Sequence, residues 1–175
     1  DGASYAVTED QAGGFTATCT GDTGVISANQ QSAAAFSNEY HAAGLYQFIG
    51  VKQLENASLS LDLFTFSVLD EDGRVVARGK NNADGSIFLD TLYFTEQDIG
   101  TKTYTIVEDL GSVPGVIYDR TQHRVTLTIT DPGNGILSVT DDLNGTPITF
   151  TNRFITDQLT VSKAVEGNVS SQNRA

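Results

Sequence analysis

The sequence predicts an all-β protein with an immunoglobulin-like β-sandwich, and three observations carry this prediction. Short runs of Thr, Val, Ile, Phe and Tyr alternate with polar residues, which is the period of a half-buried strand. Asp-Gly, Pro-Gly and Asn-Gly turn signals separate these runs. Residues 46–154 hold about eight or nine such runs, which suits one sandwich.

The expected strands can be followed along the chain. Residues 63–79, LFTFSVLDEDGRVVARG, read as a strand, an Asp-Gly turn and a second strand, and residues 81–94, NNADGSIFLDTLYF, repeat this pattern. Further turns lie in VPGVIYD, TDPGNGILSV and DLNGTPITF. Only FTEQDIG, residues 94–100, has the character of a helical turn.

The amino-acid composition of the chain argues against several classes of partner and function. Asp and Glu outnumber Lys and Arg by 22 to 10, and the resulting charge of −12 argues against nucleic acid or anionic lipid as a partner. The single cysteine, Cys19, cannot form an internal disulfide, and we expect it to be a small buried side chain. No signal peptide and no apolar run long enough to span a membrane is visible, so we expect a mature fragment.

Three polar residues fall on strand faces that are otherwise apolar. Alternate side chains of a strand share a face, and on this rule Lys52, Glu108 and Asn152 point inward. They lie in the segments FIGVKQLEN, YTIVED and ITFTNRF. The pattern recurs near the two ends of the chain, in YAVTED, AAFSNEY and LTVSKAV, which place Glu9, Asn38 and Lys163 in the same way.

A buried Lys, Glu and Asn can react together. The amine of lysine has a pKa of about 10.4 in water, and burial depresses this pKa by about 3–5 units, which yields the neutral nucleophile. Burial also raises the pKa of the acid, so we expect Glu108 to stay protonated, to donate a hydrogen bond to the Asn152 carbonyl and to shuttle protons. Attack of Lys52 on the amide carbon then expels ammonia and leaves a Lys–Asn isopeptide bond.

These segments carry a resemblance to a known family. Residues 46–154 resemble the isopeptide-forming domain of Gram-positive pilins, the streptococcal backbone-pilin linkage domain, within the wider Cna B-type family. In that family the lysine lies on the first strand, the asparagine on the last, and the glutamate in a Y-x-I-x-E box. The resemblance therefore assigns Lys52 and Asn152 to the crosslink and Glu108 to its catalysis.

The resemblance also implies a domain organisation. Residues 1–42 resemble the C-terminal half of a Cna B-type domain, with Glu9 and Asn38 in the equivalent positions. Residues 43–156 form the complete pilin-type sandwich, and residues 157–175 resemble the first strand of a further domain, with Lys163 as its lysine. Two or three strands are missing for a simple circular permutation.

Three explanations are open for the partial domains. The chain is a window from a longer tandem array, or proteolysis has removed pieces, or the tail of one molecule completes the head of the next. In the third case Lys163 and Asn38 form a second crosslink between chains. An unpaired strand and a half-domain both expose sheet edges, which favours some pairing.

The expected function is a structural stalk or pilus-shaft repeat of a Gram-positive cell-surface protein. The bond would give it mechanical and proteolytic resistance. The only expected catalysis is the single-turnover reaction of the chain on itself, with no cofactor and no metal. Expected partners are neighbouring domains or copies of the same protein, outside the cell and anchored to the wall through other parts of the protein. The alternative is an adhesive module that binds a host extracellular-matrix protein or glycan.

Overall fold

The structure is a computed structural model that describes residues 2–156 and residue 162. Its described part consists of strands, turns and one short 3₁₀ helix. The elements are β1 (Ser4–Ala6), β2 (Phe15–Thr20), β3 (Thr23–Val25), β4 (Ala35–Tyr40), β5 (Ala43–Tyr46), β6 (Ile49–Glu55), β7 (Thr65–Leu69), β8 (Val75–Asn81), β9 (Ser86–Leu89), β10 (Leu92–Thr95), η1 (Glu96–Asp98), β11 (Gly100–Glu108), β12 (Val116–Ile117), β13 (Gln122–Thr130), β14 (Ser138–Asp141) and β15 (Ile148–Phe154).

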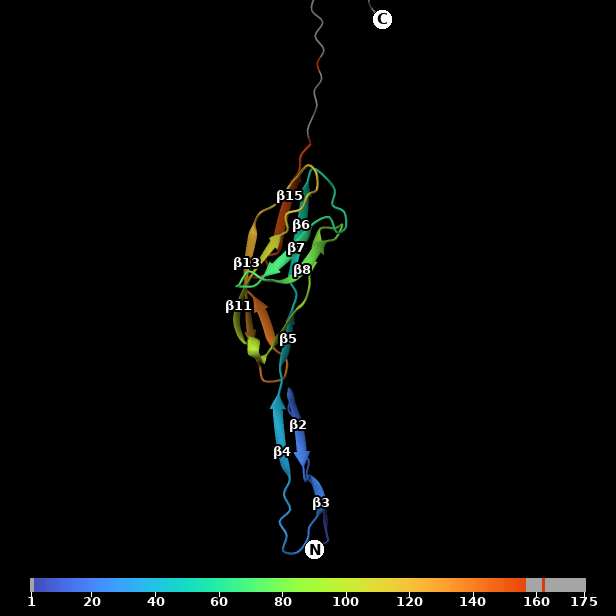
Figure 1. The fold of residues 1–175 in the computed structure, drawn as a ribbon, viewed down its shortest axis with the longest axis vertical. Coiled ribbons are helices and arrows are strands. Elements are labelled where there is room, and N and C mark those ends of the chain that lie inside the picture. Colours follow the sequence, from blue (N-terminus) through green and yellow to red (C-terminus); the bar gives the residue numbers. More distant parts are fainter. Residues whose placement is uncertain (1, 157–161, 163–175) are drawn as a thin grey trace, which may run out of the picture.

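One curled sheet forms the central domain (Figure 1). Its strand order is β12-β15-β6-β9-β8-β7-β11-β13-β14, and β5 and β10 pair separately beside it. All of its pairs are antiparallel except β15 and β6, the last and first strands of this sheet in chain order, which run parallel. The all-β, immunoglobulin-like sandwich predicted from the sequence is confirmed.

The core lies where the curled sheet closes on itself. Phe66, Val68, Ile106 and Leu127, from the middle strands, are fully buried, and Phe150 from β15 packs against Phe66 with ring centroids 5.2 Å apart. These residues occupy the alternate positions that the period-two pattern assigns to the inner face. A polar side chain on the inner face of one of these strands is therefore surrounded by apolar residues.

The turns agree with their sequence signals. The Asp-Gly turn between β7 and β8 is closed by Asp70, whose carboxylate accepts hydrogen bonds from the backbone N–H groups of Asp72 and Arg74. Gly73 in this turn has φ +77°, a conformation that glycine adopts without steric cost. The expected helical turn is η1, with Asp98 capping the N–H of Thr95.

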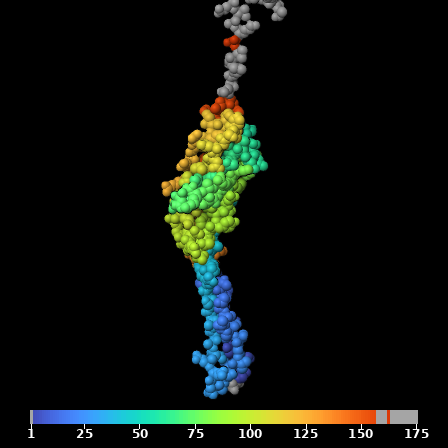
Figure 2. All heavy atoms as spheres, viewed as in Figure 1, coloured from blue at the N-terminus to red at the C-terminus, as the bar shows by residue number. Residues whose placement is uncertain are grey.

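The four N-terminal strands form two short ribbons that extend from one end of the sandwich (Figures 1 and 2). β1 pairs with β3 and β2 with β4, both antiparallel. Cys19 on β2 is exposed, so the expectation of a buried cysteine is wrong. The physical reason is that no second layer of described strands covers this ribbon.

Candidate isopeptide site

Three strands position the polar side chains inside the sandwich. β6 carries Lys52 and β15 carries Asn152, and the parallel register places Lys52 beside Phe150, two positions before Asn152. β11 contributes Glu108 from its last position. Because β11 is not a neighbour of β6 or β15 in the sheet, Glu108 reaches the other two side chains across the core.

The structure brings all three side chains together and buries them, as the strand parity predicts. Lys52 is 1 %, Glu108 6 % and Asn152 0 % exposed. The Nζ atom of Lys52 donates to Oε2 of Glu108 over 2.6 Å, and Nδ2 of Asn152 donates to Oε1 of the same carboxyl group over 2.6 Å. Glu108 therefore bridges the amine and the amide, one oxygen to each.

The Asn152 carbonyl has a partner that the sequence did not point out. Its Oδ1 accepts a hydrogen bond of 2.7 Å from the backbone N–H of Asp119, and the expectation that Glu108 donates to this oxygen is wrong. Glu108 faces the nitrogen of the amide instead. The carboxylate of Asp119 holds the loop in place by accepting from the N–H groups of Thr121 and Thr151.

The surroundings of Lys52 and Glu108 favour the uncharged forms of both side chains. Burial lowers the pKa of Lys52 against the opposing effect of the Glu108 hydrogen bond, and burial raises the pKa of Glu108 against the effects of Lys52 and Asn152. The Nζ atom of Lys52 lies 4.7 Å from the centroid of the Phe64 ring, so an apolar side chain covers that side of the amine. Both shifts favour a neutral amine beside a neutral acid, the combination that amine attack requires.

Asp119 differs from Glu108 although both are acids near the amide. Burial acts to raise the pKa of Asp119, but the hydrogen bonds from Thr121 and Thr151 outweigh this and hold it below its ordinary value. Asp119 is therefore a carboxylate that orients its own loop and presents its N–H to the Asn152 oxygen. The only sequence signal for it was its place in the segment VPGVIYD, which predicted a turn rather than a role.

The predicted residues near the N-terminus also meet each other. Nδ2 of Asn38 donates to Oε1 of Glu9 over 2.6 Å. Both side chains are exposed, so the inward placement expected from strand parity is wrong here. The alternation of side chains along a strand determines which residues share a face, but a face is buried only where another layer of the protein covers it. Lys163 lies outside the described residues.

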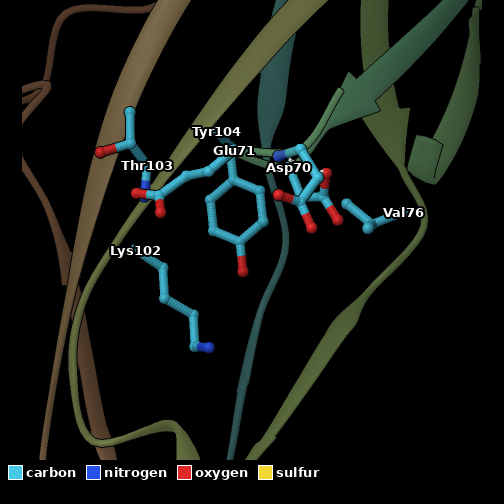
Figure 3. Close-up of a pocket in the computed structure, with 7 residues that line it drawn as sticks. Asp70, Glu71, Val76, Lys102, Thr103 and Tyr104 are labelled. Carbon is cyan, nitrogen blue, oxygen red and sulfur yellow. Dashed lines mark hydrogen bonds between the residues drawn. The ribbon is translucent and has the colours of Figure 1, made fainter. Parts of the chain in front are cut away.

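A surface pocket lies away from these residues (Figure 3). It is lined by the β7–β8 turn and by β11, including Glu71, Lys102 and Tyr104. Two of its charged side chains already have partners within the protein: Glu71 accepts from the N–H of Thr103, and Lys102 pairs with Asp98 over 3.1 Å. No cluster of side chains suited to hold a metal ion occurs in the described part of the chain.

An immunoglobulin-like sandwich in which one buried glutamate contacts both a lysine and an asparagine holds the groups that an isopeptide bond needs. Comparison with protein families gives the same class: residues 48–155 match the FctA family, described as the Spy0128-like isopeptide-containing domain. The chain belongs to this family, whose members are structural domains of pili and cell surfaces. A comparison with curated proteins finds no match. No helix among the described residues could cross a membrane.

Proposed function

We propose that the central domain is a load-bearing repeat of a Gram-positive surface stalk or pilus shaft, locked by an isopeptide bond between Lys52 and Asn152. The observation that carries this proposal is the bridging carboxyl group of Glu108, which touches the attacking nitrogen and the departing nitrogen at 2.6 Å each. An ion pair that only stabilised the fold would need just the contact between Glu108 and Lys52. The contact between Glu108 and Nδ2 of Asn152 allows the acid to deliver a proton to the nitrogen that leaves as ammonia.

The reaction follows from these contacts. The neutral Nζ of Lys52 attacks Cγ of Asn152, and the oxygen that gains negative charge keeps its hydrogen bond from the Asp119 N–H. Glu108 takes a proton from Nζ through one oxygen and delivers a proton to Nδ2 through the other. The Nζ–Cγ bond forms, the Cγ–Nδ2 bond breaks and ammonia leaves. Glu108 ends in the protonation state in which it began.

The bond would carry force past most of the domain. Lys52 lies at the middle of β6 and Asn152 two positions before the end of β15, and these parallel strands are neighbours. Tension between the two ends of the domain therefore passes from β6 to β15 through one covalent bond. The bond closes a loop of 100 positions, which by the chain-entropy argument for crosslinks stabilises the fold by about 4–5 kcal/mol.

Intact-mass spectrometry of the denatured chain tests the proposal. The mass is expected to be one ammonia below the sequence mass, and peptide mapping should join Lys52 to Asn152. The variants Lys52→Ala and Asn152→Ala should each show the full mass calculated for their own sequences. A wild-type chain of full sequence mass would overturn the proposed bond.

The adhesive alternative has less support from the described surface. The pocket of Figure 3 has Glu71 and Lys102 already bound to neighbouring groups, so it offers few free polar contacts to a ligand. The loops that join β7 to β8 and β8 to β9 are short turns. We therefore place the domain in the shaft of a surface structure, exposed outside the cell and attached to the wall through other parts of the protein.

A further inference from the structure

Asn81 is a buried polar side chain that the proposed reaction does not use. It is the last residue of β8, and 0 % of it is exposed. Its Oδ1 accepts from the N–H of Phe64 over 2.8 Å, and its Nδ2 donates to the carbonyl groups of Ser60 and Asn82 over 2.8 and 3.0 Å. A buried amide whose donors and acceptor are all bonded fixes the backbone that it contacts.

These bonds hold residues 60–64, a segment that lies between β6 and β7 and belongs to neither strand. The main chain of Asn81 adds two contacts to the same segment. Its N–H donates to the carbonyl of Phe64 over 3.3 Å, and its carbonyl accepts from the N–H of Asp62 over 2.9 Å. One residue of β8 thus binds the segment at both of its ends and at its middle, and thereby determines where Phe64 enters the core.

Phe64 is the residue through which this segment reaches the candidate site. Its side chain is buried, and Nζ of Lys52 lies over its ring, 4.7 Å from the centroid. The same ring meets that of Tyr118 edge to face, with centroids 5.7 Å apart. Tyr118 immediately precedes Asp119, whose N–H donates to the oxygen of Asn152. Phe64 therefore contacts the attacking amine and packs against the segment that orients the amide.

The cover that Phe64 provides affects which group of the pair holds the proton. Lys52 faces two acids, Glu108 on β11 and Asp119 in the loop before β13, and both favour the charged amine. The face of an aromatic ring also attracts a cation. Burial is nonetheless the largest effect on the pKa of Lys52 and lowers it, and Phe64 contributes to this burial. Water in place of the ring would stabilise the ion pair relative to the neutral pair that reacts.

We propose that Asn81 is a positioning residue for the bond between Lys52 and Asn152, because it holds Phe64 over the amine and so keeps the pair of Lys52 and Glu108 in its neutral, reactive arrangement. This role rests on the function proposed above and assigns part of it to a residue that is remote from the reacting atoms. The hydrogen bonds of the Asn81 side chain all go to backbone groups, so its effect on the reaction passes through Phe64.

The pH dependence of bond formation reports on this role. The reactive pair holds one proton, on Glu108. At lower pH Lys52 takes up a second proton, and at higher pH Glu108 loses its own, so the rate is expected to rise and then fall with pH. If water reached the amine, the proton would move to Lys52, and the ion pair would persist over a wider range of pH. The profile would then have a lower maximum and a greater width.

Refolding of unreacted chains at a series of pH values measures this profile. Chains recovered in denaturant at their full sequence mass are diluted into buffer, quenched in acid at intervals and analysed by mass spectrometry for the loss of one ammonia. Asn81→Ala is expected to widen the profile and to lower its maximum about tenfold for each unit by which the two pKa values change relative to each other. Asn82→Ala is the matched control, because its side chain donates to Ser86, and it should keep the wild-type profile.

A double variant tests whether Asn81 acts through Phe64. Phe64→Ala should lower and widen the profile in the same way, and Asn81→Ala added to it should slow the reaction no further. Reductions in rate that multiply in the double variant would overturn the role. So would a slower Asn81→Ala with the wild-type pH range, because a general loss of structure has that effect. Asn81→Ser takes the place of Asn81→Ala if the latter does not refold.

The outcomes separate this role from the proposed function. A wild-type chain that loses no ammonia would overturn the crosslink itself. A wild-type chain that forms the bond, beside Asn81 variants that form it at the same rate and over the same pH range, would overturn only the positioning role of Asn81.

Discussion

At the scale of single residues, the site depends on what burial does to two ionisable groups. Lys52 and Glu108 would form an ordinary ion pair in water, but burial lowers the pKa of the first and raises that of the second. The amide of Asn152 is held at both ends, by Glu108 at its nitrogen and by Asp119 at its oxygen. In the proposed reaction, the proximity and the charge state of these groups together allow the amine to attack the amide.

Replacing Glu108 by a neutral residue of nearly the same shape should prevent the isopeptide bond from forming. Glu108→Gln retains an oxygen that can accept from Lys52, but the amide cannot take and return a proton. We expect the folded variant to keep its full sequence mass. Glu55→Gln, an exposed position on β6, is the matched control and should still lose one ammonia. Bond formation at the wild-type extent in Glu108→Gln would show that Glu108 is not the proton shuttle.

The unreacted lysine should make stability depend on pH. Burial lowers the pKa of Lys52 in the folded state, so between that pKa and the unfolded value of about 10.4 the unfolded chain binds more protons. The Glu108→Gln variant is therefore expected to become more stable as pH rises toward about 10, by about 1.4 kcal/mol for each unit of pKa difference.

Denaturant unfolding at several pH values measures this effect. The double variant Lys52→Met, Glu108→Gln is the control, because it lacks the buried amine and should not show the gain. If both variants respond to pH in the same way, the stability change belongs to other groups of the protein.

At the scale of elements, a small joint connects the N-terminal ribbons to the sandwich. The hydroxyl of Tyr40, at the end of β4, donates to Asp131 over 2.8 Å and accepts from the N–H of Gly135 over 3.2 Å. Gly14 has φ +86°, and a Cβ atom there would lie 2.7 Å from the Cα of Gly135. The ribbons and the sandwich thus meet through backbone in direct contact, which restrains bending between them.

A methyl group at this contact should loosen the joint. Gly14→Ala combines a positive φ, which costs about 1–2 kcal/mol for a residue with Cβ, with a clash against Gly135 and the Tyr40 ring. We expect the ribbons to become more accessible to limited proteolysis while the sandwich keeps its melting temperature. Gly133→Ala has a similar φ of +82° and no atom within 4 Å of the new Cβ, so it should show the strain alone. Equal proteolysis of both variants would argue against a rigid joint at Gly14.

At the scale of the whole molecule, the elongated outline suggests a part that works under tension (Figure 2). The N-terminal ribbons lie at one end of this outline, and β6 and β15 lie in the sandwich beyond them, so a pull along the long axis runs through β6 and β15 (Figure 1). Hydrogen bonds between the remaining strands would carry little of this force once Lys52 and Asn152 are joined. The mechanical limit would then be the covalent bond.

Single-molecule pulling from the two ends should detect this path. The wild-type domain is expected to show no unfolding step from residues 53–151, because the crosslink holds this loop closed. Lys52→Ala should unfold and release its 100 positions as about 330–360 Å of extended chain. A step of that length in the wild type would contradict the force path.

The local pattern of the chain was enough to predict the inner faces of the central strands and the three polar side chains that these faces carry. Lys52, Glu108 and Asn152 were identified because alternation along a strand is a local property, and a polar residue within an apolar row is visible without any partner. The same rule failed for Glu9 and Asn38, which lie on faces that no described layer covers. Burial depends on what packs against a face, and that is not a property of the strand itself.

By itself, then, the sequence determined the strands, their turns, the all-β class and the three residue types of the buried site, because each follows from short-range alternation and turn chemistry. Only the tertiary structure decided that β15 lies parallel to β6, that Glu108 faces the amide nitrogen, and that the Asp119 N–H holds its oxygen. These contacts join residues 33 to 98 positions apart, and they depend on how the sheet curls and closes rather than on any local preference.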